Sequence, residues 1–302
     1  MSRVATIPLQ QTMSVAIQRS QEKLSITQAR LSTGKKAIDF SDLGTETVRN
    51  LSAHSMLARQ DAEATVAKRV GTTLQLYNAN LGSIDSAASD LHTQLLSAIG
   101  TGQAVGINEA IDAAFHQIAT ALNATEGGVP LFGGSQTGSD PFAASKLSDL
   151  TTMTPATAFK NDSVKTSARV ADGVDVQFGI TASDVGTDLF NAFQTLANLG
   201  KISDTPTATE KAQLAAAADT IQKGLVQVRT VDASNGRNQT QVETLATRGD
   251  QRSLVLKDVI ADNEDADLGQ VALDLTQQKQ VLQASYSVFS QLSGLSLVNY
   301  LR

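Results

Sequence analysis

The sequence predicts a mainly α-helical chain: an elongated antiparallel helical bundle or coiled coil formed by both chain ends, with a small β-containing insert between them. Apolar residues recur every seven positions in both halves of the chain. Aromatic residues make up only 4% of the 302 residues, with no Trp and 5 Pro, which suits long helices better than a sandwich or barrel. The helical period is lost only between about residues 126 and 206, where Gly, Pro, Ser, Thr and Asp become frequent.

The N-terminal axial arm, residues 1–44, carries one strong apolar residue in each heptad. The companion positions Ser20 and Thr27 are weakly apolar, so the arm supplies only half of a coiled-coil seam. Residues 1–60 carry eight Lys and Arg against four Asp and Glu, which makes this end of the chain basic. The seam residues, which we expect at a subunit interface, are Ile17, Leu24, Leu31 and Ile38.

Residues 45–125 are predicted to form the first half of a helical bundle. From about residue 66 both seam positions of the heptad are apolar, and Gly100 to Gly102 should end this helix. A second helix follows, with a stripe of Ile107, Ile111, Phe115, Ile118 and Leu122. The first helix has Val70, Leu74, Tyr77, Leu81, Ile84, Ala88, Leu91, Leu95 and Ala98 on its seam.

Residues 126–206 are predicted to form a β-containing insert that faces outward. Four of the five prolines lie here, and Val174 to Ile180 alternate apolar with polar or glycine residues after the turn sequence Asp172-Gly173, which predicts a β-hairpin. A short amphipathic helix around Leu189 to Leu196 should follow. Because residues 149–164 show little periodicity, we expect the protein to tolerate trimming of that stretch.

The second bundle half, residues 207–261, mirrors the first. We expect a helix, a break at Ser234-Asn235-Gly236, and a resumed helix through Val242 and Leu245. The stripe of the first of these helices is Leu214, Ala218, Ile221, Leu225 and Val228.

The C-terminal axial arm, residues 262–302, continues a seven-residue repeat. Residues 250–302 carry seven Asp and Glu against four Lys and Arg, so this acidic end can attract the basic first arm. In both arms the apolar burial of one chain falls short of the entropy lost on ordering, so the arms should need other copies or other proteins to cover them. The interface residues expected here are Leu268, Leu275, Leu282 and Phe289.

Composition excludes several classes of function. The net charge of −6 provides no basic field for nucleic acid, and no stretch approaches the 18 apolar residues of a membrane span. The first residues lack the unbroken apolar core of a Sec signal, so any export should follow a route that reads no cleaved signal peptide. With no Cys, disulfides and cysteine metal sites are absent.

We find no catalytic, cofactor or metal site, and expect the chain not to be an enzyme. His54, His92 and His116 lack metal-ligand spacing and are interpreted as ordinary helix or bundle histidines. The acidic run around Asp262 to Asp267 does not match an EF-hand and is interpreted as a solvated or cross-chain face. The two glycosylation tripeptides, at Asn123 and Asn238, match a pattern that often arises by chance.

Motifs near both ends resemble the flagellin superfamily across essentially the whole chain. The first arm contains Gln28-Ala-Arg-Leu-Ser-Thr-Gly-Lys-Lys36 followed by Ser41-Asp42. The last arm contains Glu264-Asp-Ala-Asp267, Gln277-Gln278 and the ending Leu295-Ser-Leu-Val-Asn-Tyr-Leu301. Each resembles a terminal signature of that family.

A further motif, in the insert, is similar to that of the hook-filament junction branch, hook-associated protein 3. It comprises Leu131, Phe132, Gly134, Pro141 and Phe142, where Val129-Pro130 replaces the Gly-Tyr of the branch motif. The pair Phe132 and Phe142 needs burial, either inside the chain's own fold or against a neighbouring subunit. The insert is short for a junction protein, so a short flagellin remains the alternative.

The resemblance implies a structural adaptor at the hook-filament junction of the bacterial flagellum, extracellular and exported through the flagellar type III apparatus. It implies that the arms form an inner coiled-coil tube, with the two bundle halves as a helical shell outside it. The implied partners are copies of the chain itself, flagellin, other hook-associated proteins and a flagellar export chaperone.

Overall fold

The structure is a computed structural model that describes the backbone of residues 3–298 and the side chains of residues 11–39, 41 and 43–291. The chain divides into two compact units, one formed by residues 1–59 with 252–302 and the other by residues 60–251. The class is mainly α with two small antiparallel sheets, as the sequence predicts. The side chains of Asp42 and of the C-terminal motif Leu295 to Leu301 lie outside the described residues.

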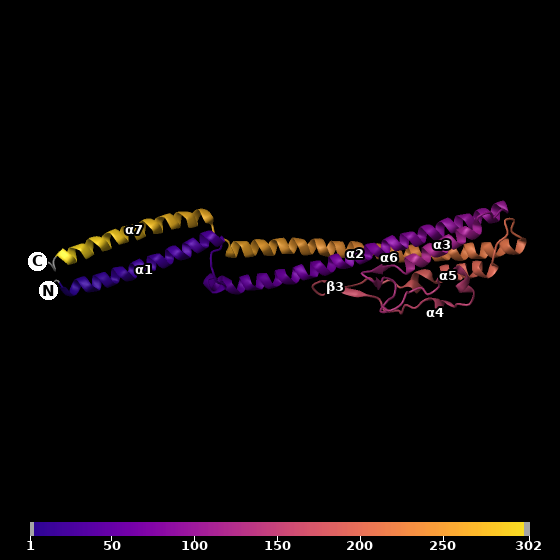
Figure 1. Cartoon of the computed structure of the whole chain (residues 1–302), viewed down its shortest axis with the longest axis horizontal. Helices are drawn as coiled ribbons and strands as arrows, with labels where there is room; N and C mark the ends of the chain where they lie inside the picture. The colour runs from indigo at the N-terminus through magenta and orange to yellow at the C-terminus, as the bar shows by residue number, and fades with distance from the viewer. Residues whose placement is uncertain (1–2, 299–302) are drawn as a thin grey trace. The chain divides into compact units, whose positions relative to one another are not determined.

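The unit formed by the chain ends is built around two helices, α1 (Arg3–Thr33) and α7 (Leu268–Val298). They lie side by side and antiparallel, because the start of α1 and the end of α7 are at the same end of the pair (Figure 1). A 3₁₀ helix, η1 (Phe40–Glu46), leads from α1 towards α2 (Thr47–Thr101), and α6 (Ala208–Glu264) ends shortly before α7 begins. The start of α2 and the end of α6 complete the unit.

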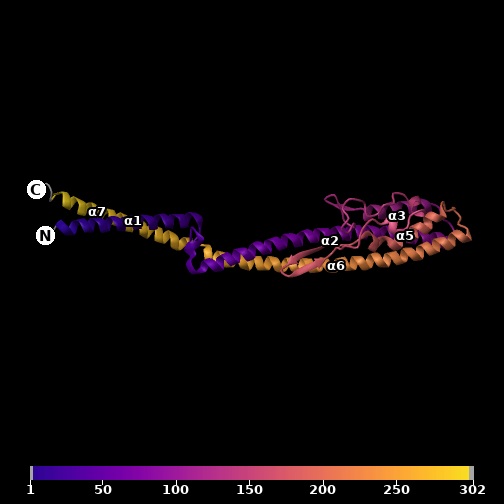
Figure 2. The ribbon, with the colours of Figure 1, turned by 90° about the horizontal axis from the view of Figure 1, so that it is seen from below.

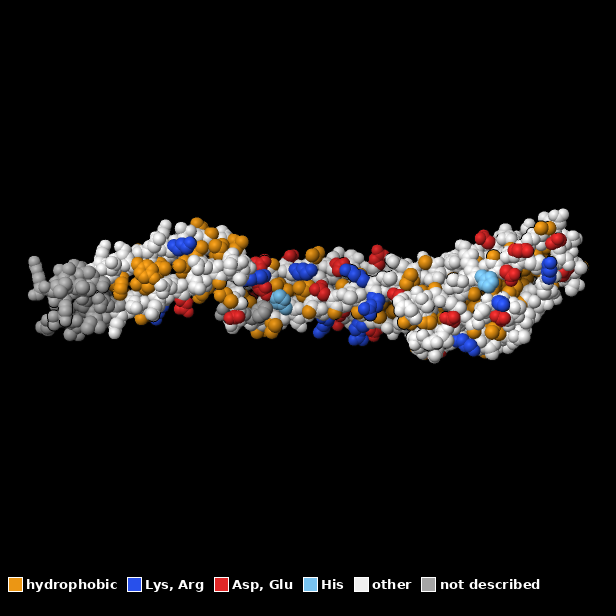
Figure 3. Space-filling view, in the orientation of Figure 1, with side chains coloured by type: hydrophobic (Ala, Val, Ile, Leu, Met, Phe, Trp, Pro, Cys, Tyr) orange, Lys and Arg blue, Asp and Glu red, His pale blue; other side chains and the backbone are white. Residues whose placement is uncertain are grey.

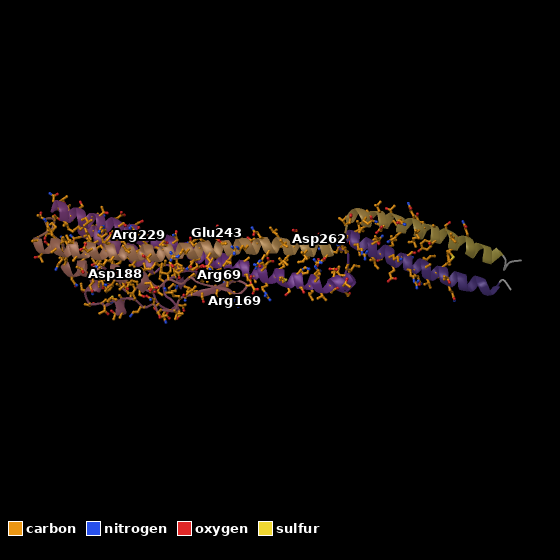
Figure 4. The ribbon with its side chains drawn as sticks, turned by 180° about the vertical axis from the view of Figure 1, so that it is seen from behind. Arg69, Arg169, Asp188, Arg229, Glu243 and Asp262 are labelled. Atoms are coloured by element: carbon orange, nitrogen blue, oxygen red, sulfur yellow. The ribbon has the colours of Figure 1, made fainter. Side chains whose placement is uncertain are left out.

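The other unit packs most of α2 and α6 with α3 (Ile107–Leu122) and α5 (Ala182–Leu199), and Figure 2 shows α2 and α6 running alongside each other here. All nine residues of the predicted α2 seam are buried, and so are the predicted α3 and α6 stripes. Their burial follows from the periodicity, since residues three and four apart share a helix face. Arg229 of α6 (labelled in Figure 4) also forms an ion pair with Asp85 of α2, with 2.7 Å between its Nε and the Asp85 Oδ1.

The expected helix break at Ser234-Asn235-Gly236 is wrong, because α6 runs unbroken from Ala208 to Glu264. Asn235 is only 2% exposed and donates from Nδ2 to the carbonyl oxygen of Leu74 in α2 at 3.0 Å. Gln239, one turn later, donates to the same oxygen at 2.9 Å. A mid-helix Gly costs only about 1 kcal/mol relative to Ala, which packing along the whole of α6 outweighs.

The insert contains the predicted hairpin, with β3 (Ser167–Ala171) antiparallel to β4 (Val174–Gln177). Its turn has Gly173 at φ 69°, and Val176, Phe178 and Ile180 are buried as the alternation predicts. A smaller hairpin, β1 (Thr125–Glu126) with β2 (Val129–Pro130), was not expected. Its two-residue turn is Gly127-Gly128, both at positive φ, which only glycine adopts without strain.

Residues 149–164 contribute buried side chains to the core of the larger unit, which argues against the expectation that trimming there is tolerated. They form parts of η2 (Leu147–Thr151) and α4 (Pro155–Ala158), and Leu150, Ala158 and Phe159 are buried in the same core cluster as α3 and α5. These elements are too short to show a helical period, so their core residues leave no pattern in the sequence. None of the described helices is long and apolar enough to cross a membrane.

Candidate assembly surface

The predicted arm residues are unevenly buried in the α1/α7 pair. Ile17 is buried at 9% exposure, while Leu31, Ile38 and Leu268 are 38%, 57% and 50% exposed. The remaining four, Leu24, Leu275, Leu282 and Phe289, are half-buried. The pairing of α1 with α7 therefore covers only part of the heptad seam.

Other large apolar side chains of the two arm helices are also exposed to solvent. Figure 3 shows orange apolar side chains gathered on the surface of this pair. A contiguous apolar surface of this kind marks an interaction site more often than a solvated face. In α1 and α7 the exposed members beyond the predicted seam are Val15, Ile26, Leu273, Val281, Tyr286 and Val288, with exposures from 38% to 67%.

Polar contacts also join the two arm helices. Gln21 of α1 donates from Nε2 to the hydroxyl oxygen of Tyr286 in α7 at 2.5 Å. Thr27, the weak companion position of the seam, is 5% exposed and donates its hydroxyl to the Lys23 carbonyl oxygen. Its small size and satisfied hydroxyl explain how the seam tolerates a polar residue.

The two terminal sequence signatures meet at a joint where both helical segments of the arms are interrupted. Gly34, at φ 70°, ends α1 and accepts a hydrogen bond at its carbonyl oxygen from the Ala266 amide at 2.8 Å. The Lys36 amide donates to the Glu264 carbonyl oxygen at 2.6 Å, and Lys35 and Asp265 form an antiparallel bridge. Residues about 230 positions apart in sequence thus share backbone hydrogen bonds.

The Glu264 carboxylate is the centre of this joint, and its side chain is only 14% exposed. Its Oε1 lies 2.5 Å from Nε2 of His54 and 2.6 Å from Nδ2 of Asn50, both on α2. Its Oε2 lies 3.2 Å from Nζ of Lys35, which also contacts Asp265 at 2.6 Å. Burial alone would raise the pKa of Glu264, but hydrogen bonds from His54, Asn50 and Lys35 outweigh it and hold the pKa at about 2.

Asp262, Asp265 and Asp267 of the acidic run are exposed, as expected for a solvated face, whereas Glu264 is shielded and has partners within this chain. Asp267 accepts from the amides of Gly269 and Gln270, which caps the start of α7. Lys36 donates from Nζ to the carbonyl oxygen of Asp262, labelled at the end of α6 in Figure 4. Among the residues that the structure describes, no group of three or more His, Asp or Glu has a geometry that would hold a metal ion.

Sequence reasoning missed His54 and Asn50 as parts of this joint. Neither residue is part of a recognisable motif in α2, and their partner Glu264 is more than 200 residues away in the sequence. The one available signal was the expected attraction between the basic first arm and the acidic last arm, which the Lys35 ion pairs confirm at this point.

The insert motif is packed inside the larger unit, which decides between the two alternatives for its aromatic pair. Phe132 is fully buried and meets Tyr77 edge to face at 5.1 Å between ring centroids. Phe142 is 5% exposed and packs against Phe159 at 5.4 Å and Phe115 at 6.1 Å. The pair closes a core within one chain.

The other motif residues hold the loop in this position. Pro141 and Leu131 are buried, and the Leu131 carbonyl oxygen accepts from the Tyr77 hydroxyl at 2.6 Å. Gly134 has φ 67°, and a side chain there would collide with Asp162. Asn123 uses both ends of its side-chain amide on the Phe142 backbone, at 2.8 Å each, so it is not available as a glycosylation acceptor.

The fold is shared with solved structures of flagellar proteins. A structure described as a flagellar hook-associated protein from Vibrio parahaemolyticus is similar with a TM-score of 0.54 and 16% identity, covering 72% of this chain and 97% of that one. FlgL from Bacillus cereus is similar with a TM-score of 0.55 and 14% identity, covering 70% of this chain and 98% of that one. No protein-family model matches the sequence, and no curated protein matches it. At these identities the likeness shows a common fold.

Proposed function

We propose that this chain is a non-enzymatic structural subunit of the bacterial flagellum that polymerises through its two terminal arms. The observation that carries the proposal is the incompletely covered apolar seam of α1 and α7. Covering these exposed apolar side chains with neighbouring copies would remove them from water, which favours assembly. The fold shared with flagellar hook-associated proteins supports the same role.

Within the flagellum, we assign the chain to the hook-filament junction, outside the cell, where its partners are copies of itself, flagellin and other hook-associated proteins. The insert motif around Phe132 and Phe142 and the fold of the two neighbours favour this position. The proposed assignment includes export through the flagellar type III apparatus, with a chaperone that covers the exposed apolar side chains of the arms.

Deleting the gene tests the junction role. We expect intact hooks, with flagellin secreted into the medium but not polymerised, because the adaptor lattice is missing. Immunogold labelling of wild-type flagella should mark one narrow ring between hook and filament.

The alternative is a short flagellin, favoured by an insert that is short for a junction protein. In that case gold would decorate the whole filament. A deletion strain that still grows filaments from hooks with an intact junction ring would also support the flagellin and overturn the junction assignment.

A further inference from the structure

The seam between α1 and α7 leaves unexplained how the two arms stay together in a free chain. Among the described apolar residues of these two helices, only Ile17 and Val271 reach the buried class, each at 9% exposure. Apolar contact of that extent contributes little against the entropy of ordering about 60 helical residues. Order at the base of the pair in a free chain therefore needs another contact.

The Glu264 joint can provide such a contact, because donors from two separate segments meet one shielded carboxylate on a third segment. Lys35 follows α1, Asn50 and His54 belong to α2, and Glu264 itself ends α6 immediately before α7. A carboxylate that is only 14% exposed needs all of these donors, since losing one leaves a poorly hydrated charge without compensation.

We infer that Glu264 is a latch. It fixes the roots of the two arms, meaning the end of α1 and the start of α7, to the start of α2, so that both arms are held or released there together. The positions farther along the arms fray independently of the latch, because their seam is thin. The inference goes beyond the proposed function and does not depend on it, since it concerns the isolated chain.

The backbone of the joint makes the release of the two arms mutual. The Lys36 amide binds the carbonyl oxygen of Glu264, and the Ala266 amide binds that of Gly34. If the root of α1 leaves, the root of α7 loses its backbone partners as well, and the reverse holds. Asn50, with 0% exposure, keeps its Glu264 partner only while the end of α6 stays in place beside α2.

The charge on Glu264 gives the latch a pH dependence whose sign is fixed. Facing this carboxylate are Lys35 and His54, with Asp265 beside Lys35 and with Lys36 on the carbonyl oxygen of Asp262. The folded pKa of about 2 lies below the value of about 4.3 for an unfolded Glu. The latch therefore contributes fully above about pH 4.3, and its contribution is lost as the pH falls towards 2.

Limited trypsin digestion of the full-length monomer at neutral pH tests the latch, because natural cleavage sites lie both within the joint and farther along α1. We expect cleavage after Arg19 and Lys23 to precede cleavage after Lys35 and Lys36 in the wild type. In Glu264→Gln, cleavage after Lys35 and Lys36 should accelerate by roughly ten- to a hundredfold, as the loss of a charged hydrogen-bond partner implies.

The matched control is Glu243→Gln, an exposed position on the same helix, labelled in Figure 4, which should leave all cleavage rates unchanged. Thermal melting of the larger unit, followed by circular dichroism, confirms that each variant is folded. Rapid cleavage after Lys35 and Lys36 in the wild type would overturn the latch, as would an unchanged pattern in folded Glu264→Gln.

A second measurement separates the charge latch from a purely structural role. Hydrogen exchange of peptides spanning residues 34–38 and 262–267, corrected for intrinsic rates, should show protection that falls in both peptides together between pH 5 and pH 2. In Glu264→Gln the protection should be low and free of this pH step. Loss of protection in one peptide only, or the same step in the variant, would contradict the proposal.

Discussion

At the scale of single residues, the insert motif stabilises the core of one chain. Phe132 is fully buried against Tyr77, so Phe132→Ala would open a cavity in the larger unit and lower its free energy of unfolding by about 3–5 kcal/mol. Denaturant unfolding measures the change. Val129→Ala, three residues earlier and 49% exposed, is the control and should cost less than about 1 kcal/mol. A normal melt for Phe132→Ala would contradict internal packing.

Two glycines of the same loop make a matched pair for a backbone test. Gly134 has φ 67° and faces Asp162, whereas an added methyl group at Gly138 would meet no atom within 4 Å. Gly134→Ala should therefore destabilise the larger unit by about 1–3 kcal/mol, and Gly138→Ala should be neutral or slightly stabilising. Thermal unfolding of both variants decides this, and equal effects would show that the collision with Asp162 is easily relieved.

At the scale of elements, α6 contains a buried amide that replaces the expected helix break. Asn235 donates to the Leu74 carbonyl oxygen, while its own Oδ1 is buried and has no hydrogen-bond partner in the structure. Asn235→Leu should therefore leave the melting temperature unchanged or raise it, because it removes an unsatisfied polar atom. Asn235→Asp should lower it sharply, since a buried carboxylate would face a carbonyl oxygen. If Leu destabilises as much as Asp, packing shape decides this position.

The arm helices are the elements on which the assembly depends. Leu275 is half-buried in the free chain, so Leu275→Asp should change the unfolding of the larger unit by less than about 0.5 kcal/mol while abolishing polymerisation, where neighbours would bury the new carboxylate. Sedimentation and electron microscopy measure the polymer. Ala284→Asp, nine residues on and facing the opposite side of α7, controls for the added charge and should weaken assembly less. Equal loss in both variants would show that assembly does not depend on the seam face.

At the scale of the whole molecule, we expect the purified chain to be monomeric and the arm segments beyond the Glu264 joint to become ordered only on assembly. Arm segments beyond the Glu264 joint have few buried apolar residues to offset the entropy of ordering. Sedimentation should give one monomeric species, and hydrogen exchange should be fast in residues 11–30 and 270–291 compared with the α2 seam. Protection of those segments equal to that of the α2 seam in dilute solution would contradict this prediction.

The sequence determined the helices of the larger unit and most of its core, because a helix with one buried face must repeat apolar residues at the helical period. The seam residues from Val70 to Ala98 are all buried as predicted, and the hairpin follows from the alternation after Asp172-Gly173. The sequence also predicted that the first arm has an incomplete seam, because only one of the two seam positions in its heptads is strongly apolar.

Only the tertiary structure decided the features that depend on contacts between distant residues. The Glu264 joint brings together Lys35, Asn50 and His54, none of which has a local signal, because ion pairs and hydrogen bonds impose no period on the sequence. The continuity of α6 through Asn235-Gly236 depends on a carbonyl oxygen of α2, and the burial of Leu150 and Phe159 depends on α3 and α5. A periodic pattern of burial can be recognised from neighbouring residues in the sequence. A hydrogen bond or ion pair between residues 200 positions apart exists only once the fold has placed them together.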